Sequence, residues 1–213
     1  KRKLDSDVVV PVPASARDAA IEIARTLNLK YREALVKNRY IGRTFIMPVD
    51  KKRKTSVRQK LNPIASEVRG KKVLLVDDSI VRGTTSRHIV ELMKESGAVE
   101  VHVRIGSPQI IAPCYLGVDM PTREELIART RPVDEVKESI MATSLHHVSL
   151  EALVKAIGID RENLCTGCLT GKYPLSIEGE SCLSRSIDFV VGSYQAKLGS
   201  FPPDTGSAKS GEN

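Results

Sequence analysis

The chain has 213 residues, of which 41% are hydrophobic and 28% charged, and it carries a formal net charge of +7. These values are ordinary for one globular domain with extensions, and they argue against a largely disordered chain. No apolar run approaches the roughly 20 residues of a membrane span, and no signal-peptide pattern is present. We therefore expect a cytoplasmic protein without membrane contact.

The first predicted elements lie before residue 30. Val8–Val10 reads as a short strand that Pro11 ends, and Ser15 as the N-cap of a helix. That helix has apolar residues at helical spacing: Ala19, Ala20, Ile23, Ala24 and Leu27. Residues 36–46 give no clear pattern, and residues 49–60 are polar and basic without a hydrophobic period, which predicts a mobile loop.

A second group of elements alternates strand with helix. Val73–Val76 predicts a strand buried on both faces, and Thr84–Ser96 a helix that ends near Gly97. The next strand is predicted by alternating apolar residues, which are Val99, Val101, Val103 and Ile105.

Three further helices are predicted toward the end of the chain. The segment Thr122–Arg129 opens with a capping box, and Val133–Ile140 and Leu150–Ile157 follow. The order of elements predicts an α/β fold: a mostly parallel sheet with helices on both faces and a C-terminal helical extension. We assign residues 1–175 to this domain and residues 176–213 to a tail that is partly disordered, since Pro, Gly and Ser dominate from residue 199.

Two adjacent carboxylates, Asp77 and Asp78, follow the strand Val73–Val76, and the turn Arg82–Ser86 follows them. Ligands of open α/β sheets bind at the carboxyl ends of strands. A Gly-Thr-Thr-Ser turn at a helix start offers N–H groups and hydroxyls to a phosphate. Neighbouring carboxylates repel and are rarely left unused. The pattern therefore indicates a sugar phosphate, with or without Mg²⁺.

The stretch Val73–Ser86 resembles the 5-phosphoribosyl-1-pyrophosphate (PRPP) motif of type I phosphoribosyltransferases. The resemblance implies that the paired acids hold the ribose hydroxyls, that the turn holds the 5′-phosphate, and that Mg²⁺ lies at Ser15, Asp77 and Asp78. It implies these PRPP-binding residues: Asp77, Asp78, Ser79, Arg82, Gly83, Thr84, Thr85 and Ser86.

The segment Lys37–Pro48 resembles the start of the flexible active-site loop in the glutamine PRPP amidotransferase (amidophosphoribosyltransferase) family. Such a loop would exclude water from the ribosyl cation that forms at the transition state. Gly42 could supply the bend, and basic side chains could neutralise pyrophosphate. The resemblance implies these catalytic residues: Lys37, Tyr40, Arg43, Asp77 and Asp78.

Basic runs contribute much of the positive charge, at Lys51–Lys54 and at Arg69–Lys72. Nucleic-acid binding is one interpretation of such runs. The chain has only three Phe, five Tyr and no Trp, so side chains for base stacking are scarce. A polyanionic small substrate explains the same charge, and we expect no nucleic-acid partner.

Four cysteines are present, and the pair Cys165-x-x-Cys168 could ligate zinc or an iron–sulfur cluster, act as a redox pair or do nothing. Cys114 follows the last predicted strand and could be a third ligand. In a rival zinc interpretation His146 and His147 take part, although neighbouring side chains of a strand point to opposite faces.

The cysteine pattern resembles the cluster-bearing branch of the amidotransferase family. The resemblance implies a 4Fe–4S cluster with a structural role on Cys114, Cys165 and Cys168, with a fourth ligand upstream of this region. Cys182 does not match a ligand position. The match runs from about Asp7 to Pro174, and the family's N-terminal glutaminase domain is absent from this chain. Ala14 replaces an acid that the family usually has before Ser15.

The resemblance implies the formation of 5-phosphoribosylamine from PRPP and glutamine-derived ammonia, with release of pyrophosphate. This is the first step of de novo purine biosynthesis, and we expect a homo-oligomer. Two alternatives share the fold. A purine-salvage phosphoribosyltransferase would need an aromatic residue that stacks on the base. It would not need the cysteine pattern. A PRPP-binding regulator would need an added nucleic-acid module, such as a helix-turn-helix, which is not seen in the sequence.

Overall fold

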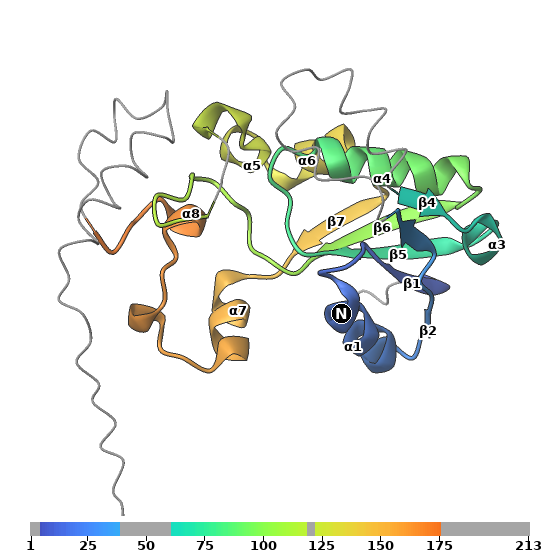
Figure 1. Cartoon of the computed structure of the whole chain (residues 1–213), viewed down its shortest axis with the longest axis horizontal. Helices are drawn as coiled ribbons and strands as arrows, with labels where there is room; N and C mark the ends of the chain where they lie inside the picture. Colours follow the sequence, from blue (N-terminus) through green and yellow to red (C-terminus); the bar gives the residue numbers. More distant parts are fainter. Residues whose placement is uncertain (1–4, 39–60, 119–121, 176–213) are drawn as a thin grey trace, which may run out of the picture.

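The computed structural model describes residues 5–38, 61–118 and 122–175. Its centre is a five-stranded sheet in the order β2-β1-β5-β6-β7, in which every neighbouring pair is parallel (Figure 1). The predicted parallel sheet is thus confirmed, with β5 in the middle. The strands are β1 (Val8–Pro11), β2 (Lys30–Tyr31), β5 (Lys72–Asp77), β6 (Glu100–Ile105) and β7 (Ser144–His147).

Helices cover both faces of the sheet, as the sequence predicted. Helices α4 (Thr84–Glu95) and α6 (Val133–Ser139) lie on one face and α1 (Arg17–Leu27) on the other (Figure 1). The alternation of side chains along β5 divides the core, because Val73 and Leu75 pack in the cluster on the α4 side and Leu74 and Val76 in the cluster on the α1 side. All four are at most 1% exposed, which explains why β5 is apolar without a break.

The start of α1 differs from the prediction. Ala16, not Ser15, occupies the N-cap position, no side-chain hydrogen bond caps the helix, and Ser15 is exposed in the preceding turn. Asp18 lies in the first turn of α1, where a negative charge stabilises the helix N-terminus. The predicted N-cap at Ser15 is therefore wrong by one residue.

A short hairpin that the sequence did not predict lies beside the main sheet. Strand β3 (Leu35–Lys37) pairs antiparallel with β4 (Leu61–Pro63), so that Lys37 faces Leu61. Helix α3 (Ala65–Val68) follows. The hairpin brings together the two ends of segment 38–60, and the predicted loop 49–60 and Gly42 lie outside the described residues.

The predicted single helix from Thr122 to Arg129 is wrong. Residues Arg123–Glu125 form the 3-10 helix η1, Leu126 is extended (φ −78°, ψ 106°), and α5 begins only at Ile127 and ends at Thr130. Leu126 is 1% exposed and packs against Ile110. The backbone leaves the helical conformation where this buried side chain enters its apolar cluster.

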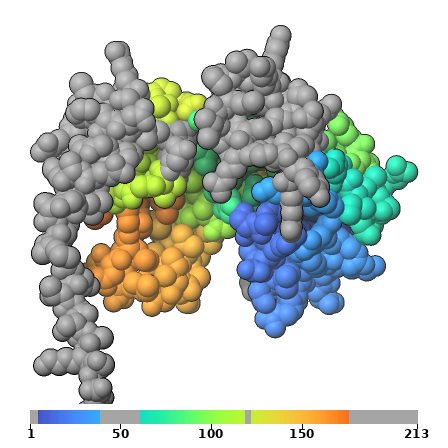
Figure 2. All heavy atoms as spheres, viewed as in Figure 1, coloured from blue at the N-terminus to red at the C-terminus, as the bar shows by residue number. Residues whose placement is uncertain are grey.

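The predicted C-terminal helical extension is confirmed and begins with α7 (Leu150–Ile157), whose bounds match the prediction. Ser149 caps this helix by accepting a 3.1 Å hydrogen bond from the backbone N–H of Ala152. The extension continues with η2 (Arg161–Asn163) and α8 (Gly167–Thr170). Figure 2 shows this extension (orange) and α1 (blue) as separate bulges of the surface. Among the described helices, none is long and apolar enough to span a bilayer.

Candidate functional site

The predicted acid pair and the predicted Mg²⁺ residue Ser15 lie at the same edge of the sheet. Strands β1 and β5 are parallel, with Pro11 opposite Val76, and the N–H of Val12 donates to the Val76 carbonyl at 2.8 Å. The turn that contains Ser15 follows β1, and Asp77 ends β5. Both segments therefore leave the sheet at its carboxyl edge, where ligands of such sheets bind.

Asp77 and Asp78 differ in environment although they are neighbours. Asp78 is exposed, and its carboxylate accepts a 2.8 Å hydrogen bond from the Ser79 hydroxyl. Asp77 is half-buried, and its Oδ1 accepts a 2.9 Å hydrogen bond from the Asp78 N–H. Burial and then repulsion by Asp78 raise the pKa of Asp77 to about 7, against the lowering effect of that N–H. A cation or hydroxyl donors beside the pair would relieve this unfavourable charge.

The predicted phosphate turn leads directly into the N-terminus of α4. Gly83 is the N-cap residue and has φ of 75°, a left-handed backbone that glycine adopts without strain. The first N–H groups of a helix have no intrahelical partner and suit an anion. The hydroxyl side chains of Thr84 and Thr85 are exposed beside them, and Ser86 is 5% exposed. The turn thus supplies free donors about six residues after the acid pair.

Arg82 pairs with Glu125, a residue that no functional motif in the sequence singles out. Its Nη2 donates a 2.9 Å hydrogen bond to Oε2 of Glu125. The two residues are 43 positions apart, and Glu125 sits in a segment that looked like an ordinary capped helix. A pairing that depends on tertiary structure leaves no local signal in one sequence.

The predicted basic residues separate in space. Lys37 is exposed on β3, while Lys72 begins β5 at the end opposite Asp77 and forms ion pairs with Asp5 and Glu100. The run Arg69–Lys72 therefore does not lie at the carboxyl edge. The other predicted positive or catalytic positions are outside the described residues, namely Tyr40, Arg43 and Lys51–Lys54.

Two segments distant in sequence bring the predicted cysteine ligands together. The carbonyl of Cys168 accepts hydrogen bonds from the N–H groups of Ile111 (2.9 Å) and Ala112 (3.1 Å). The Tyr173 hydroxyl donates to the Pro113 carbonyl at 2.6 Å. Cys114 and Cys168 consequently pack against the same apolar cluster.

The three described cysteines, Cys114, Cys165 and Cys168, are free thiols. Burial raises the pKa of the Cys168 thiol, and the negative charges of Cys114 and Cys165 add to this effect. Within the described part of the chain, however, no group of three or more His, Cys, Asp or Glu side chains is arranged to hold a metal ion.

The two histidines of the zinc alternative lie on β7. His147 is half-buried, and its Nδ1 is 3.2 Å from the Ser107 carbonyl. Burial lowers the pKa of His147, and burial together with Arg104 lowers that of the exposed His146. Since neighbouring strand residues alternate between faces, the two rings do not converge on one point.

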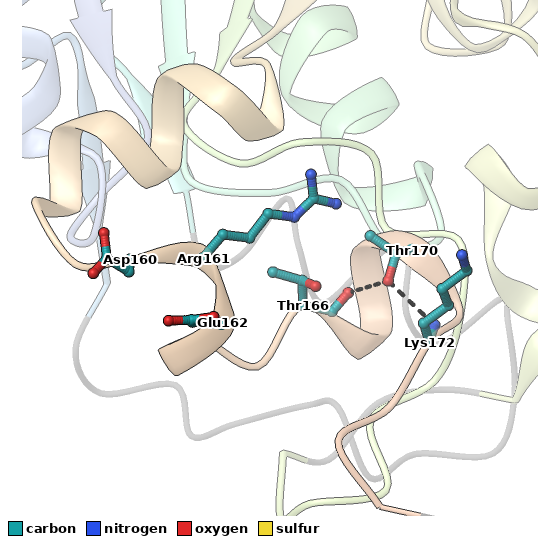
Figure 3. Close-up of a pocket in the computed structure, with 6 residues that line it drawn as sticks. All are labelled: Asp160, Arg161, Glu162, Thr166, Thr170 and Lys172. Carbon is teal, nitrogen blue, oxygen red and sulfur yellow. Dashed lines mark hydrogen bonds between the residues drawn. The ribbon is translucent and has the colours of Figure 1, made fainter.

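Two pockets lie away from the carboxyl edge. One, of about 620 Å³, is in the C-terminal extension, where Arg161 extends from η2 toward α8 and Thr170 donates to the Thr166 carbonyl at 2.9 Å (Figure 3). Counting Arg161, its lining holds two acidic residues, Asp160 and Glu162, and two basic ones, Arg161 and Lys172, so it has no clear charge preference. The second, of about 510 Å³, lies at the amino ends of β1 and β5. Neither includes a predicted site residue.

Comparisons with known proteins agree with the observed fold. Residues 2–106 match the family model described as "Phosphoribosyl transferase domain". The chain is 52% identical over 176 residues to an amidophosphoribosyltransferase of Methanothermobacter thermautotrophicus, covering 83% of this chain and 37% of that protein. It is 54% identical over 181 residues to that of Archaeoglobus fulgidus (84% and 40%). It is 48% identical over 192 residues to that of Bacillus subtilis (88% and 40%).

A solved structure of the Bacillus subtilis glutamine PRPP amidotransferase, complexed with ADP and GMP, has a TM-score of 0.74 to this chain. The identity is 48%, and the match covers 83% of this chain and 40% of that one. A structure described as the allosteric regulatory enzyme of purine biosynthesis also has a TM-score of 0.74, at 47% identity over 85% of this chain. The chain spans about two fifths of the length of these relatives.

Proposed function

We propose, since the chain belongs to the amidophosphoribosyltransferase family, that it is the phosphoribosyltransferase part of such an enzyme. It would form 5-phosphoribosylamine from PRPP and glutamine-derived ammonia and release pyrophosphate, in the first step of de novo purine biosynthesis. One observation carries the proposal: the acid pair Asp77 and Asp78 and the N-terminus of α4 lie on one turn at the carboxyl edge of a parallel sheet.

The acid pair would orient the ribose and stabilise the charge that develops on it. Ammonia is itself a nucleophile, so the reaction at C1 of the ribose needs positioning and charge stabilisation rather than an activated side chain. Ribose hydroxyls bound to Asp77 and Asp78 would hold C1 in place as pyrophosphate leaves. The same carboxylates favour the positive charge of the ring at the transition state.

The turn after the acid pair would bind the 5′-phosphate. The N–H groups at the start of α4 and the hydroxyls of Thr84, Thr85 and Ser86 supply several donors to one dianion. Gly83 lets the backbone turn toward the ligand, and Arg82 lies in the same turn, where its guanidinium pairs with Glu125. The Ser79 hydroxyl would help to orient the Asp78 carboxylate through the hydrogen bond that it donates to it.

A magnesium ion would be held by Asp77 and Asp78, directly or through water, with Ser15 nearby. The donor set fits, because carboxylate and hydroxyl oxygens are the ligands that Mg²⁺ prefers. The close approach of two carboxylates at one edge also favours a cation there. The ion would supply a positive charge for the pyrophosphate group.

Lys37, Tyr40 and Arg43 remain the proposed partners of pyrophosphate. Lys37 is exposed at the end of β3, and cations near a departing anion stabilise the transition state.

The three cysteines would hold a 4Fe–4S cluster with a structural role. Cys114, Cys165 and Cys168 supply three soft ligands from two segments that already contact each other. A cubane needs a fourth ligand, which another part of the full-length protein would provide. We further propose that this part includes a glutaminase domain that supplies ammonia, and that the protein is a homo-oligomer.

Isothermal titration of PRPP with Mg²⁺ into the protein tests the substrate assignment. We expect binding by the wild type and at least tenfold weaker binding by the variant with Asp77→Asn and Asp78→Asn, since lost charged hydrogen bonds cost about 1.5–3 kcal/mol each. Asp134→Asn is the matched control, because the Asp134 side chain is 89% exposed on α6. Unchanged binding by the double variant would contradict the proposed site.

A further inference from the structure

Val81 and the first two residues of the phosphate turn, Arg82 and Gly83, contact one short segment, Glu125–Ile127. The Ile127 N–H donates to the Val81 carbonyl at 3.0 Å. Arg82 donates to Glu125 at 2.9 Å. A Cβ added to Gly83 would lie only 2.7 Å from Cδ1 of Ile127, so this side chain fills the space that a larger residue at 83 would need. We call Glu125–Ile127 the brace.

The brace is itself fixed in the fold. Leu126 is 1% exposed and belongs to an apolar cluster with Ile110, against which Val81 packs. Leu126 also interrupts what would otherwise be a continuous helix from 123 to 130. The break aims the Glu125 side chain at Arg82 and the Ile127 side chain at Gly83.

The positive charge of Arg82 is paired with the carboxylate of Glu125. The side chain is 31% exposed and that of Glu125 is 41% exposed, so the pair is neither fully solvated nor buried. The Arg82 Nε atom is buried and makes no hydrogen bond within the described part of the chain. If Arg82 bound the phosphate while paired with Glu125, the Glu125 carboxylate would lie close to the phosphate dianion and would repel it.

We infer that Arg82 serves the phosphate site indirectly: with Glu125 it forms an ion pair that holds the turn 81–86 against the brace, so that the N–H groups at the start of α4 are fixed where a phosphate binds. Arg82 and Glu125 are then positioning residues. This inference rests on the proposed function for the identity of the ligand, but the contact between turn and brace does not depend on it.

The direction in which Glu125→Gln changes the affinity for PRPP distinguishes this role from direct contact between Arg82 and the ligand. If the pair positions the turn, Glu125→Gln loosens the turn and weakens PRPP binding. If Arg82 instead contacts the phosphate, Glu125 is a competing and repelling carboxylate, and Glu125→Gln tightens binding.

A double-mutant cycle on the full protein provides the test. We expect Arg82→Gln and Glu125→Gln each to raise the KM for PRPP about fivefold with little change in kcat, as for the loss of a half-exposed ion pair. The double variant should be no worse than either single one. The exchanged pair, Arg82→Glu with Glu125→Arg, should recover part of the loss. Tighter or unchanged binding in Glu125→Gln, or additive losses, would overturn the inference.

Hydrogen exchange of the ligand-free protein gives a second readout that needs no substrate. Both single variants should lose protection at the amides of residues 81–86 to a similar extent. Arg87→Gln is the matched control, because Arg87 forms a 2.9 Å ion pair with Glu91 on the exposed side of α4. It should change neither exchange at 81–86 nor KM.

The two readouts keep the inference apart from the proposed function. A wild type that does not bind PRPP, with loss of protection in both variants, would reject the substrate and leave the brace in place. Unchanged protection in both variants would reject the brace, whatever the protein binds.

Discussion

The backbone N–H of Asp78 donates a 2.9 Å hydrogen bond to the carboxylate of Asp77, so the Asp77 side chain is held in place before any ligand binds. The N–H of Gly106, which follows β6, donates to the Asp77 carbonyl at 2.9 Å and anchors the same residue from the neighbouring strand. The Asp77 carboxylate is thus presented from an anchored strand end, next to Asp78. Such preorganisation is what a site that works by positioning and charge requires.

Gly83 should tolerate no side chain. Gly83→Ala combines a φ of 75° with a 2.7 Å contact to Ile127, so we expect it to lower the free energy of unfolding by roughly 1–3 kcal/mol and to weaken PRPP binding. Gly158→Ala is the matched control, since Gly158 has nearly the same φ (74°) and nothing within 4 Å of its added Cβ. Urea unfolding measures the free energy of unfolding of the two variants. Equal losses in the two variants would show that the contact with Ile127 is unimportant.

The cysteines should carry a cluster in the full-length protein. Anaerobically purified protein should be brown, with roughly four iron and four sulfide per chain as a cubane requires. Cys165→Ser or Cys168→Ser should remove the colour and destabilise the fold, because cluster binding contributes to folding. Cys182→Ser is the control and should leave the colour intact. Colourless wild-type protein with one bound zinc would show that the metal assignment is wrong. Colourless protein without any metal would show that the cysteines hold no cluster.

Stability should fall at mildly acidic pH through His147. Burial lowers the pKa of His147 below its ordinary value of about 6.5, so on acidification the unfolded chain takes up a proton that the folded chain does not. The contribution of His147 to folding stability is therefore lost as pH falls below about 6.5, while Asp77, whose pKa is raised to about 7, acts in the opposite direction over the same range. His147→Gln should reduce this loss without abolishing it, since the pKa of His146 is lowered too. Urea titrations at pH 5.5 and 7.5 provide the measurement, at values about one unit either side of that pKa. An identical loss in the variant would reject this role.

The central elements could be predicted from the sequence because their signals are local. The unbroken apolar run Val73–Val76 reflects a strand buried on both faces, and its carboxyl end fixes where Asp77 and Asp78 lie. Helix α7 was predicted with its observed bounds, since its Ser149 cap and terminal Gly158 are both local features.

The remainder depends on contacts between distant residues. Strands β3 and β4 have three residues each and pair across residues 38–60, too short to produce a hydrophobic period. The Thr122–Arg129 segment has helical propensity throughout, yet burial of Leu126 and the pairing of Glu125 with Arg82 break it in two. Ser15 lost its predicted capping role because the helix starts two residues later at Arg17. In each case tertiary packing outweighed a weak local preference.

The decisive measurement of the proposed activity is the release of pyrophosphate from PRPP by the full-length protein, with ammonia as the nitrogen source and Mg²⁺ present. We expect ammonia-dependent turnover by the wild type. The variant with Asp77→Asn and Asp78→Asn should lose roughly two orders of magnitude or more in turnover, because transition-state electrostatics are removed. Circular dichroism should show that this variant stays folded, because both acids lie at a strand end. Near-normal turnover by the folded double variant would contradict the assignment of this edge of the sheet as the active site.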